Sequence, residues 1–276
     1  MIKPAVKLLK EANVIDYLRS KSRYLPFSVS QIKSVKIVDK YSNSNFLYRI
    51  VVSQGKKVQI YFLKQAWQYN KRSYLAGQPI AVDSSRIIGE VYLIRYLNKL
   101  WPAGTVPKVY FFDKQAKVFL MSDVSKKGKL LADEFDKNKI HPEIAPVLAK
   151  HLSLLHIKSY KRRLKTGSNE SYEKMMKDFL FGKKWWGYAL DKFFNKKEIN
   201  DFYKEVKKNS NCLIWGDPIN RNIFVRPNGR VGLVDFDFTM NYDPMLDVGV
   251  LLAHWLWMKE KGNSKLSRDC QKFLGE

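Results

Sequence analysis

Short runs rich in apolar residues recur along the chain between residues 31 and 121. In residues 58–64 alternation places Val58, Ile60, Phe62 and Lys64 on one side, as in a half-buried strand. Polar or glycine-containing segments separate five such runs, at residues 35–38, 46–52, 58–64, 108–113 and 117–121. We therefore predict an antiparallel sheet of five strands in this part of the chain.

Helical periodicity marks other stretches. Apolar residues recur three and four positions apart at residues 5–17, 86–100, 142–160 and 245–258, and this spacing predicts four helices. A chain of 276 residues exceeds the usual size of one compact core. We expect an α+β protein in two parts, an N-terminal antiparallel five-stranded sheet plus a helix and a mainly helical C-terminal part.

Two apolar runs in the last quarter of the chain flank Asn228-Gly229, which is the strongest short-range signal for a hairpin with a type I′ turn. With these two residues as the loop, Asn222 faces Asp235 across the open end of the hairpin. Asp217 lies five residues before Asn222 on the incoming loop. The pattern therefore predicts that two carboxylates and one amide meet at that end.

These three side chains indicate a chemistry. Carboxylate and amide oxygens suit Mg²⁺, which is usually shared with substrate phosphates, and residues 213–237 contain no His or Cys that would indicate zinc. In kinases a catalytic-loop Asp takes the proton of the substrate hydroxyl, an Asn five residues later holds metal, and an Asp after a short hairpin holds the metal at the ATP phosphates. Asp217, Asn222 and Asp235 match these roles in order. The alternative is a surface hairpin in which Asp and Asn serve as turn residues.

Lys64 and Glu90 form a second candidate group. Lys64 shares one side of its predicted strand with three apolar residues, and Glu90 falls within the apolar stripe of the predicted helix 86–100. A buried charge needs a partner, and a strand lysine paired with a helix glutamate is the arrangement that orients the lysine on ATP phosphates in kinases. A surface pair between Glu90 and Arg86, four residues earlier, is the alternative.

The segment around the hairpin resembles the catalytic core of the aminoglycoside phosphotransferase and choline kinase superfamily. The superfamily motif runs roughly His-Gly-Asp-x-x-x-x-Asn, then Ile-Asp-Phe, then Asp-Pro and a closing Asp. The matching residues here are Trp215-Gly216-Asp217, Asn222, Val234-Asp235-Phe236, Asp243-Pro244 and Asp247. Trp215, where the superfamily carries His, is the departure.

This resemblance implies a two-lobed protein-kinase-like fold. Residues 1–121 would form the N-terminal nucleotide-binding lobe, residues 122–125 the hinge, and residues 126–276 the C-terminal catalytic and acceptor-binding lobe with the catalytic hairpin. Asp247 would tie down the catalytic loop. We interpret His156 as a structural residue, because a lone His on a mostly apolar helix is more often a satisfied core residue than a catalyst.

The resemblance also implies contacts with ATP. The loop that contains Ser42, Asn43 and Ser44 is similar to the Gly-x-Ser-Asn stretch of the aminoglycoside kinases, and its backbone N–H groups would face the phosphates. An ordinary polar hairpin loop is the alternative. In the superfamily the hinge backbone reads the adenine edge, and the hinge residues here are Ser122, Asp123 and Val124.

The predicted function is that of an ATP-dependent and Mg²⁺-dependent kinase that transfers the γ-phosphate to a hydroxyl of a sugar or amino-alcohol acceptor. Two alternatives stay open. The compact C-terminal tail and the basic charge also resemble the lipopolysaccharide sugar kinases, which phosphorylate Kdo or heptose at the cytoplasmic membrane face. Trp215 and the glycine-poor phosphate loop would also suit a pseudokinase that binds nucleotide without transferring phosphate.

Charge widens the set of partners. The chain has 50 Lys and Arg against 26 Asp and Glu, a net charge of +24, which favours an anionic ligand or a membrane surface. A Lys-rich proteome explains the excess equally well. Residues 161–210 combine lysines with aromatic residues, including Trp185 and Trp186, which we interpret as helix core rather than a quaternary-ammonium box or a nucleic-acid platform. Nucleic acid is disfavoured because the sequence has no recognisable nucleic-acid-binding motif.

Location follows from simple features. The sequence has no run of eighteen apolar residues and no uninterrupted apolar signal core at its start, so we expect a cytoplasmic protein, with a location peripheral to the inner membrane face as the alternative. Cys212 and Cys270 are too few for a disulfide framework and are interpreted as reduced thiols.

Overall fold

The computed structural model describes residues 7–39, 44–79, 81–137, 139, 141–162 and 192–260. The chain divides into two compact units. Unit 1 comprises Met1–Arg95 and Pro107–Asp123, and unit 2 comprises Tyr96–Val106 and Val124–Glu276. The division differs from the predicted lobes at Tyr96–Val106, because this stretch bonds to unit 2: the Trp101 indole donates to the His151 carbonyl at 3.0 Å and the Leu233 amide donates to the Thr105 carbonyl at 2.7 Å.

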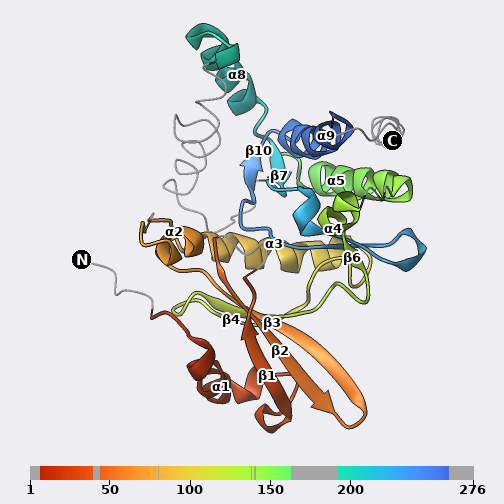
Figure 1. Cartoon of the computed structure of the whole chain (residues 1–276). Coiled ribbons are helices and arrows are strands. Elements are labelled where there is room, and N and C mark those ends of the chain that lie inside the picture. Colours follow the sequence, from red (N-terminus) through yellow and green to blue (C-terminus); the bar gives the residue numbers. More distant parts are fainter. Residues whose placement is uncertain are drawn as a thin grey trace. The chain divides into compact units, whose positions relative to one another are not determined.

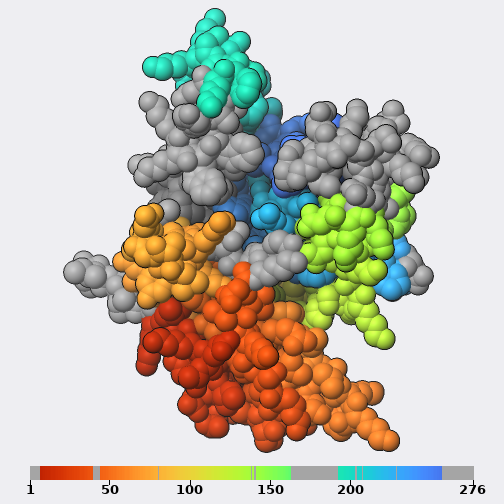
Figure 2. Space-filling view, in the orientation of Figure 1, coloured from red at the N-terminus to blue at the C-terminus, as the bar shows by residue number. Residues whose placement is uncertain are grey.

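Unit 1 is built on an antiparallel sheet of five strands with the order β1-β2-β3-β5-β4 (Figure 1). The strands are β1 (Ile32–Ile37), β2 (Phe46–Gln54), β3 (Lys57–Gln65), β4 (Val109–Asp113) and β5 (Val118–Ser122). The predicted sheet is therefore confirmed. The long hairpin of β2 and β3 turns at Gly55, where φ is 63°, and its tip, in orange, lies on the surface (Figure 2).

The two faces of this sheet have different partners. Helix α1 (Glu11–Ser20) covers one face, where Val14 and Leu18 join the buried cluster that includes Leu63. Alternation along β3 directs Lys64 to the opposite face, where it pairs with helix α3 (Arg86–Leu100). Unit 1 also contains η1 (Ser22–Tyr24), η2 (Val29–Gln31) and the short helix α2 (Lys71–Leu75).

The first helix begins later than predicted. The sequence pattern placed it at residues 5–17, but within the described residues α1 starts at Glu11. Residues 7–9 are instead held against the sheet by the buried Gln65, which accepts from the Leu9 amide and donates to the Lys7 carbonyl, both at 2.9 Å. These bonds take the backbone groups that a helix would have used.

Unit 2 is mainly helical. Its helices are α4 (Leu131–Asp136), η3 (Pro142–Ile144), α5 (Ala145–Ser159), α8 (Lys196–Lys208) and α9 (Met245–Glu260). Two small sheets lie among them. One pairs β7 (Cys212–Ile214) with β10 (Met240–Tyr242), and the other has the order β6-β8-β9, formed by β6 (Lys129–Leu130), β8 (Ile223–Val225) and β9 (Val231–Leu233). The short turns η4 (Asn220–Asn222) and η5 (Pro227–Gly229) flank β8.

The catalytic hairpin exists, but its predicted register is wrong by one residue. Ile223 pairs with Leu233, and the Val234 amide donates to the Asn222 carbonyl at 3.0 Å, so Asn222 faces Val234 rather than Asp235. The loop has three residues, Pro227–Gly229, instead of two. Within this loop Gly229 has a positive φ of 66°. This suits a three-residue loop in which a turn is followed by one left-handed residue.

Within the described residues, no helix has both the length and the apolar character needed to cross a membrane.

Candidate active site

The loop after β7 carries the predicted reacting carboxylate. Trp215, Gly216 and Asp217 follow the strand directly, and η4 then brings Asn222 back beside Asp217. The Asn222 Nδ2 group donates to Asp217 Oδ2 at 2.9 Å and to the Asp217 carbonyl at 3.0 Å. Because Nδ2 is used in this way, Oδ1 is the atom of the amide that could take a cation.

Asp217 lies in a strongly acidic environment. Burial, followed by the nearby carboxylates of Asp235 and Asp237, raises the pKa of Asp217 from 3.8 to about 8, and the hydrogen bond from Asn222 opposes the rise. The Asp235 and Asp237 carboxylates therefore act on Asp217 electrostatically, and Asn222 contacts it directly. That Asp217, Asn222 and Asp235 form one site for metal and substrate stays a prediction.

The backbone at Asp235 departs from the strand geometry that the predicted register assumed. It lies two residues beyond the end of β9, and its φ of 63° is in the left-handed region that residues other than glycine rarely adopt. A one-residue change of register would turn a regular strand residue to the other side. The left-handed backbone interrupts the strand geometry at Asp235, so strand alternation does not fix the direction of its side chain.

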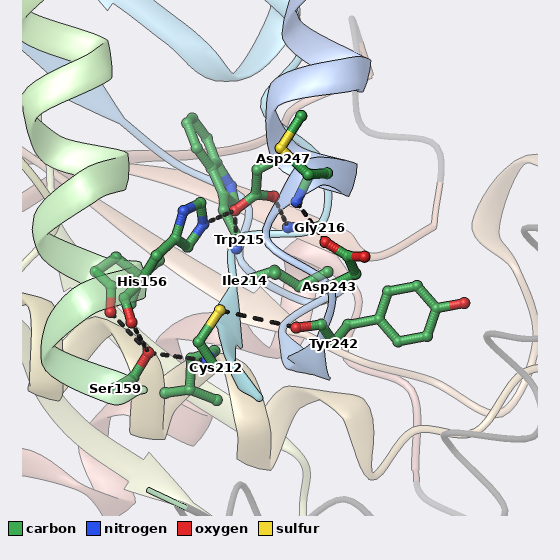
Figure 3. Close-up of polar contacts among 12 residues, drawn as sticks. His156, Ser159, Cys212, Ile214, Trp215, Gly216, Tyr242, Asp243 and Asp247 are labelled. Carbon is green, nitrogen blue, oxygen red and sulfur yellow. Dashed lines mark hydrogen bonds and ion pairs between the residues drawn. The ribbon is translucent and has the colours of Figure 1, made fainter. Parts of the chain in front are cut away.

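A buried clamp holds the loop. Asp247, at the start of α9, is fully buried, and it accepts from the Trp215 amide at 2.9 Å, the Gly216 amide at 2.7 Å and His156 Nε2 at 2.9 Å. Figure 3 shows its carboxylate between the His156 ring on α5 and the two backbone amides. The predicted architectural role of Asp247 and the structural role of His156 are confirmed by these contacts.

Gly216 allows the loop to pass close to its neighbour. Its φ of 87° is in the left-handed region, and a Cβ at this position would collide with the carbonyl oxygen of Phe238. Both features require glycine. The Gly of the Trp-Gly-Asp motif is therefore needed for the backbone path that delivers Asp217.

The second predicted group lies in unit 1. Lys64 Nζ is 2.7 Å from Glu90 Oε1, and both residues are almost completely buried. The predicted pairing of this strand lysine with the helix glutamate is confirmed. Arg86 is also buried rather than on the surface, and its guanidinium donates to the Asp83 carbonyl at 2.9 Å and to Asn45 Oδ1 at 2.7 Å.

The predicted phosphate loop is described only in part. Ser42 and Asn43 lie outside the described residues. Ser44 follows them, and its carbonyl accepts from Arg86 at 3.2 Å. On the preceding side, the buried Lys71 donates to the Val38 carbonyl at 2.8 Å. Buried basic side chains therefore fasten the described residues on both sides of residues 40–43.

Arg86 and Lys71 were not found as functional residues by sequence reasoning. Both read as ordinary surface cations at the start of helices, and nothing in their spacing indicates partners more than thirty positions away. Asp237 was also missed. Its signal was present, because a second carboxylate follows Asp235 after one residue.

The predicted hinge residues lie where the two units meet in sequence. Ser122 ends β5 and its hydroxyl accepts from the Lys108 amide at 2.9 Å. Asp123 is the last residue of unit 1 and Val124, which is buried, belongs to unit 2.

Cys212 is a buried free thiol, and burial raises its pKa to about 12. Trp185, Trp186 and Cys270 lie outside the described residues.

The side-chain oxygens of Asn222 and Asp235 are the candidate ligands for Mg²⁺. Within the described ranges, no three His, Cys, Asp or Glu side chains come together in a way that could hold a metal ion. The predicted pair of Asn222 and Asp235 combines an amide with a carboxylate. This fits Mg²⁺, which keeps several waters and takes one or two carboxylates together with substrate phosphates. Burial is the largest cause of the raised pKa of Asp217, and the Asp235 and Asp237 carboxylates add a repulsion that a bound cation would relieve.

Comparison with known proteins supports the resemblance to a phosphotransferase family over part of the chain. The model of the phosphotransferase enzyme family matches residues 186–271, and no curated protein sequence matches the chain. The match covers Trp215 to Asp247 and therefore includes all the motif residues of the hairpin. Together with the two-unit fold, it confirms the resemblance to the aminoglycoside phosphotransferase and choline kinase superfamily and the protein-kinase-like fold.

Three solved structures illustrate the shared fold. The choline kinase LicA from Streptococcus pneumoniae is 18% identical, with a TM-score of 0.53 over 94% of this chain and 78% of that one. The ethanolamine kinase of Plasmodium vivax is 13% identical, with a TM-score of 0.51 over 99% and 77%. The AMP-bound spectinomycin phosphotransferase is 15% identical, with a TM-score of 0.53 over 96% and 80%. At these identities the likeness establishes the fold.

Proposed function

We propose that the protein is an ATP-dependent kinase that transfers the γ-phosphate to a hydroxyl of a small molecule. The observation that carries the proposal is the hydrogen bond between Asn222 and Asp217, together with the effect of the Asp235 carboxylate on the pKa of Asp217. Each has the residue type and the order along the chain that phosphoryl transfer requires. The phosphotransferase family match over the same residues supports this reading.

The chemistry assigns one task to each residue. Asp217 orients the acceptor hydroxyl and takes its proton as the oxygen forms a bond to the γ-phosphorus, while the bond from that phosphorus to the β-phosphate oxygen breaks and ADP leaves. Asn222 and Asp235 would hold Mg²⁺, which would neutralise phosphate charge. A nearby cation also favours the ionised form of Asp217 that a base requires.

The residues of unit 1 have the nucleotide role. Lys64, oriented by Glu90 at 2.7 Å, would bind ATP phosphates. The buried pair is suited to this task because Glu90 fixes the ammonium group, and an oriented charge loses little entropy when phosphate arrives. The backbone of residues 122–124 would bind adenine. Complexes of related folds with AMP are consistent with this use.

The acceptor is a hydroxyl compound of the sugar or amino-alcohol class. The solved structures with this fold include a choline kinase, an ethanolamine kinase and a spectinomycin phosphotransferase. The acidic surroundings of Asp217 favour a cationic acceptor, because carboxylates attract an ammonium group. We therefore place amino alcohols before anionic sugars such as Kdo and heptose.

The experiment is phosphate transfer from radiolabelled ATP with Mg²⁺ to a panel of choline, ethanolamine, aminoglycosides, neutral sugars and anionic sugars. With the acceptor that the panel identifies, Asp217→Asn and Asp235→Asn should each lower kcat by about 10²-fold or more, because each removes a group used in the transition state. Asp201→Asn, on the exposed surface of α8, is the control and should retain wild-type turnover.

Two results would contradict the proposal. Wild-type kcat in Asp217→Asn would remove the base from its role. Nucleotide binding by the wild type without transfer to any member of the panel would favour a nucleotide-binding pseudokinase.

A further inference from the structure

Trp215 stands at the motif position where the superfamily that this chain resembles carries His. Its indole makes a specific hydrogen bond. The indole is completely buried, and its Nε1–H donates to the carbonyl oxygen of Asp235 at 2.8 Å. The same ring stacks on Phe236, with centroids 5.2 Å apart and an angle of 30° between the planes. One side chain therefore contacts both the residue that would hold metal and its neighbour.

The contact falls where the backbone most needs support. Asp235 adopts a φ of 63°, and a left-handed conformation costs a residue with a Cβ about 1 kcal/mol or more. Such a conformation persists only where the surroundings impose it. Without a donor to its carbonyl, the peptide after Asp235 could rotate toward a regular strand geometry, and this rotation would redirect the carboxylate.

Trp215 is itself anchored. Its backbone amide donates to Asp247 Oδ2 at 2.9 Å, and Asp247 also binds His156 and the Gly216 amide. A continuous series of bonds thus connects α5 and α9 with the Asp235 backbone, and Trp215 is the step that crosses from the catalytic loop to the hairpin. A side chain fixed at its own backbone can impose a conformation on its neighbour.

The choice of tryptophan has a chemical consequence. An indole N–H is a donor at every ordinary pH, whereas imidazole changes its charge near neutrality. The Trp215 amide contacts the Asp247 carboxylate, and the ring contacts the Asp235 backbone. An imidazole at position 215 would titrate beside these two acidic residues, whereas the indole supplies the bond without titrating.

We propose that Trp215 is a positioning residue whose indole N–H holds the Asp235 backbone in the conformation that would bind Mg²⁺. The inference rests on the proposed function and extends it by naming how the metal ligand is held. If packing alone held Asp235, any aromatic ring of similar size at position 215 would hold it equally well. If the hydrogen bond holds it, a ring without an N–H donor would not.

The test compares Trp215→Phe with Trp255→Phe in the full-length protein. Both replace a buried indole of unit 2 by a smaller ring, but only the first removes the donor to Asp235. ADP binding is measured calorimetrically with Mg²⁺ and with EDTA, and thermal unfolding reports the fold. We expect Trp215→Phe to weaken the Mg²⁺-dependent affinity for ADP about fivefold to thirtyfold, the effect of losing one partly buried hydrogen bond. ADP binding in EDTA and all binding by Trp255→Phe should stay within about twofold of wild type.

Trp215→His supplies a second test that does not depend on how well the phenylalanine variant folds. It restores a ring N–H donor and should recover most of the Mg²⁺-dependent affinity that Trp215→Phe loses. Wild-type Mg²⁺ dependence in a folded Trp215→Phe, or a Trp215→His that is as weak as Trp215→Phe, would overturn the inference. A wild-type protein that binds ADP equally with Mg²⁺ and with EDTA would instead refute the proposed function.

Discussion

Asp217 combines two properties that oppose each other at the scale of a single residue. In its proposed role as a base Asp217 must be ionised, yet burial and the carboxylates of Asp235 and Asp237 raise its pKa to about 8. The same groups that make the site attractive to a cation therefore favour the protonated acid when no cation is bound. The resulting competition between a proton and a metal ion should be visible in the stability of the protein.

The sign of the effect follows from linkage. The pKa of Asp217 rises on folding from 3.8 to about 8, so between these values the folded state binds a proton that the unfolded state has released. Stability from this group is fully present below about pH 4 and is lost as the pH rises toward 8. Asp217→Asn cannot titrate and should not show this loss.

We therefore predict that, in EDTA, the melting temperature of Asp217→Asn rises relative to wild type as the pH increases from 5 to 9. Differential scanning fluorimetry at half-unit pH intervals measures this difference. Adding Mg²⁺ should narrow it by stabilising the ionised wild type. Parallel curves for the two proteins over the whole range would show that the environment of Asp217 is not acidic enough to matter.

At the scale of elements, the catalytic loop depends on backbone geometry as much as on side chains. Gly216 and Gly55 both have φ in the left-handed region, at 87° and 63°. A Cβ on Gly55 would meet nothing within 4 Å, whereas one on Gly216 would collide with the backbone of Phe238. The two positions thus separate the cost of conformation from the cost of collision.

We predict that Gly216→Ala lowers the free energy of unfolding by roughly 3 kcal/mol, because a left-handed alanine and an overpacked contact both destabilise. Gly55→Ala, the matched control, should cost about 1 kcal/mol from conformation alone. Urea unfolding of both variants measures the two values. Equal destabilisation would mean that the loop can shift away from Phe238 at little cost.

The elements also show where sequence patterns were sufficient. Helix α3 (Arg86–Leu100) begins and ends where the apolar period predicted, and the buried pair of Lys64 and Glu90 follows from one charged residue within each apolar stripe. The hairpin loop was misjudged because Asn228-Gly229 is only part of the turn. The preceding Pro227 joins it, since proline suits the first central position of a turn and cannot donate to a ladder.

At the scale of the whole molecule, an acidic site is embedded in a strongly basic chain. The net charge of +24 should attract anionic ligands at long range, while the carboxylates around Asp217 favour cations locally. ATP, which carries phosphates and arrives with Mg²⁺, benefits from both. The excess charge extends over the chain; Figure 2 shows α8, in teal, at the surface of unit 2, and its sequence contains five lysines.

Nucleotide binding should therefore depend on salt. We predict that the dissociation constant of ADP with Mg²⁺ rises several-fold between 50 and 500 mM KCl, because screening removes the long-range attraction. Adenosine, which has no phosphates, is the matched ligand and should bind with little dependence on salt. Competition against a fluorescent adenine nucleotide measures both. If salt weakened the binding of ADP and of adenosine equally, the net positive charge of the chain would not act on the phosphates.

The sequence by itself determined which residues could perform the chemistry and which elements carry them. Apolar periods are local properties, so the five strands, α3 and the order Asp217, Asn222, Asp235 could be derived from spacing alone. Buried charges also indicate their own need for partners, as Lys64 and Glu90 did.

Only the tertiary structure decided how those residues are held. The left-handed Asp235, the indole bond from Trp215, the Asp247 clamp and the contacts of Arg86 and Lys71 all join positions that are distant in sequence or depend on a dihedral angle. Such contacts form only when separate elements pack together, and a one-dimensional pattern contains no record of which polar groups will then meet. The physical reason is that hydrogen bonds at short range depend on three-dimensional position, whereas burial follows period.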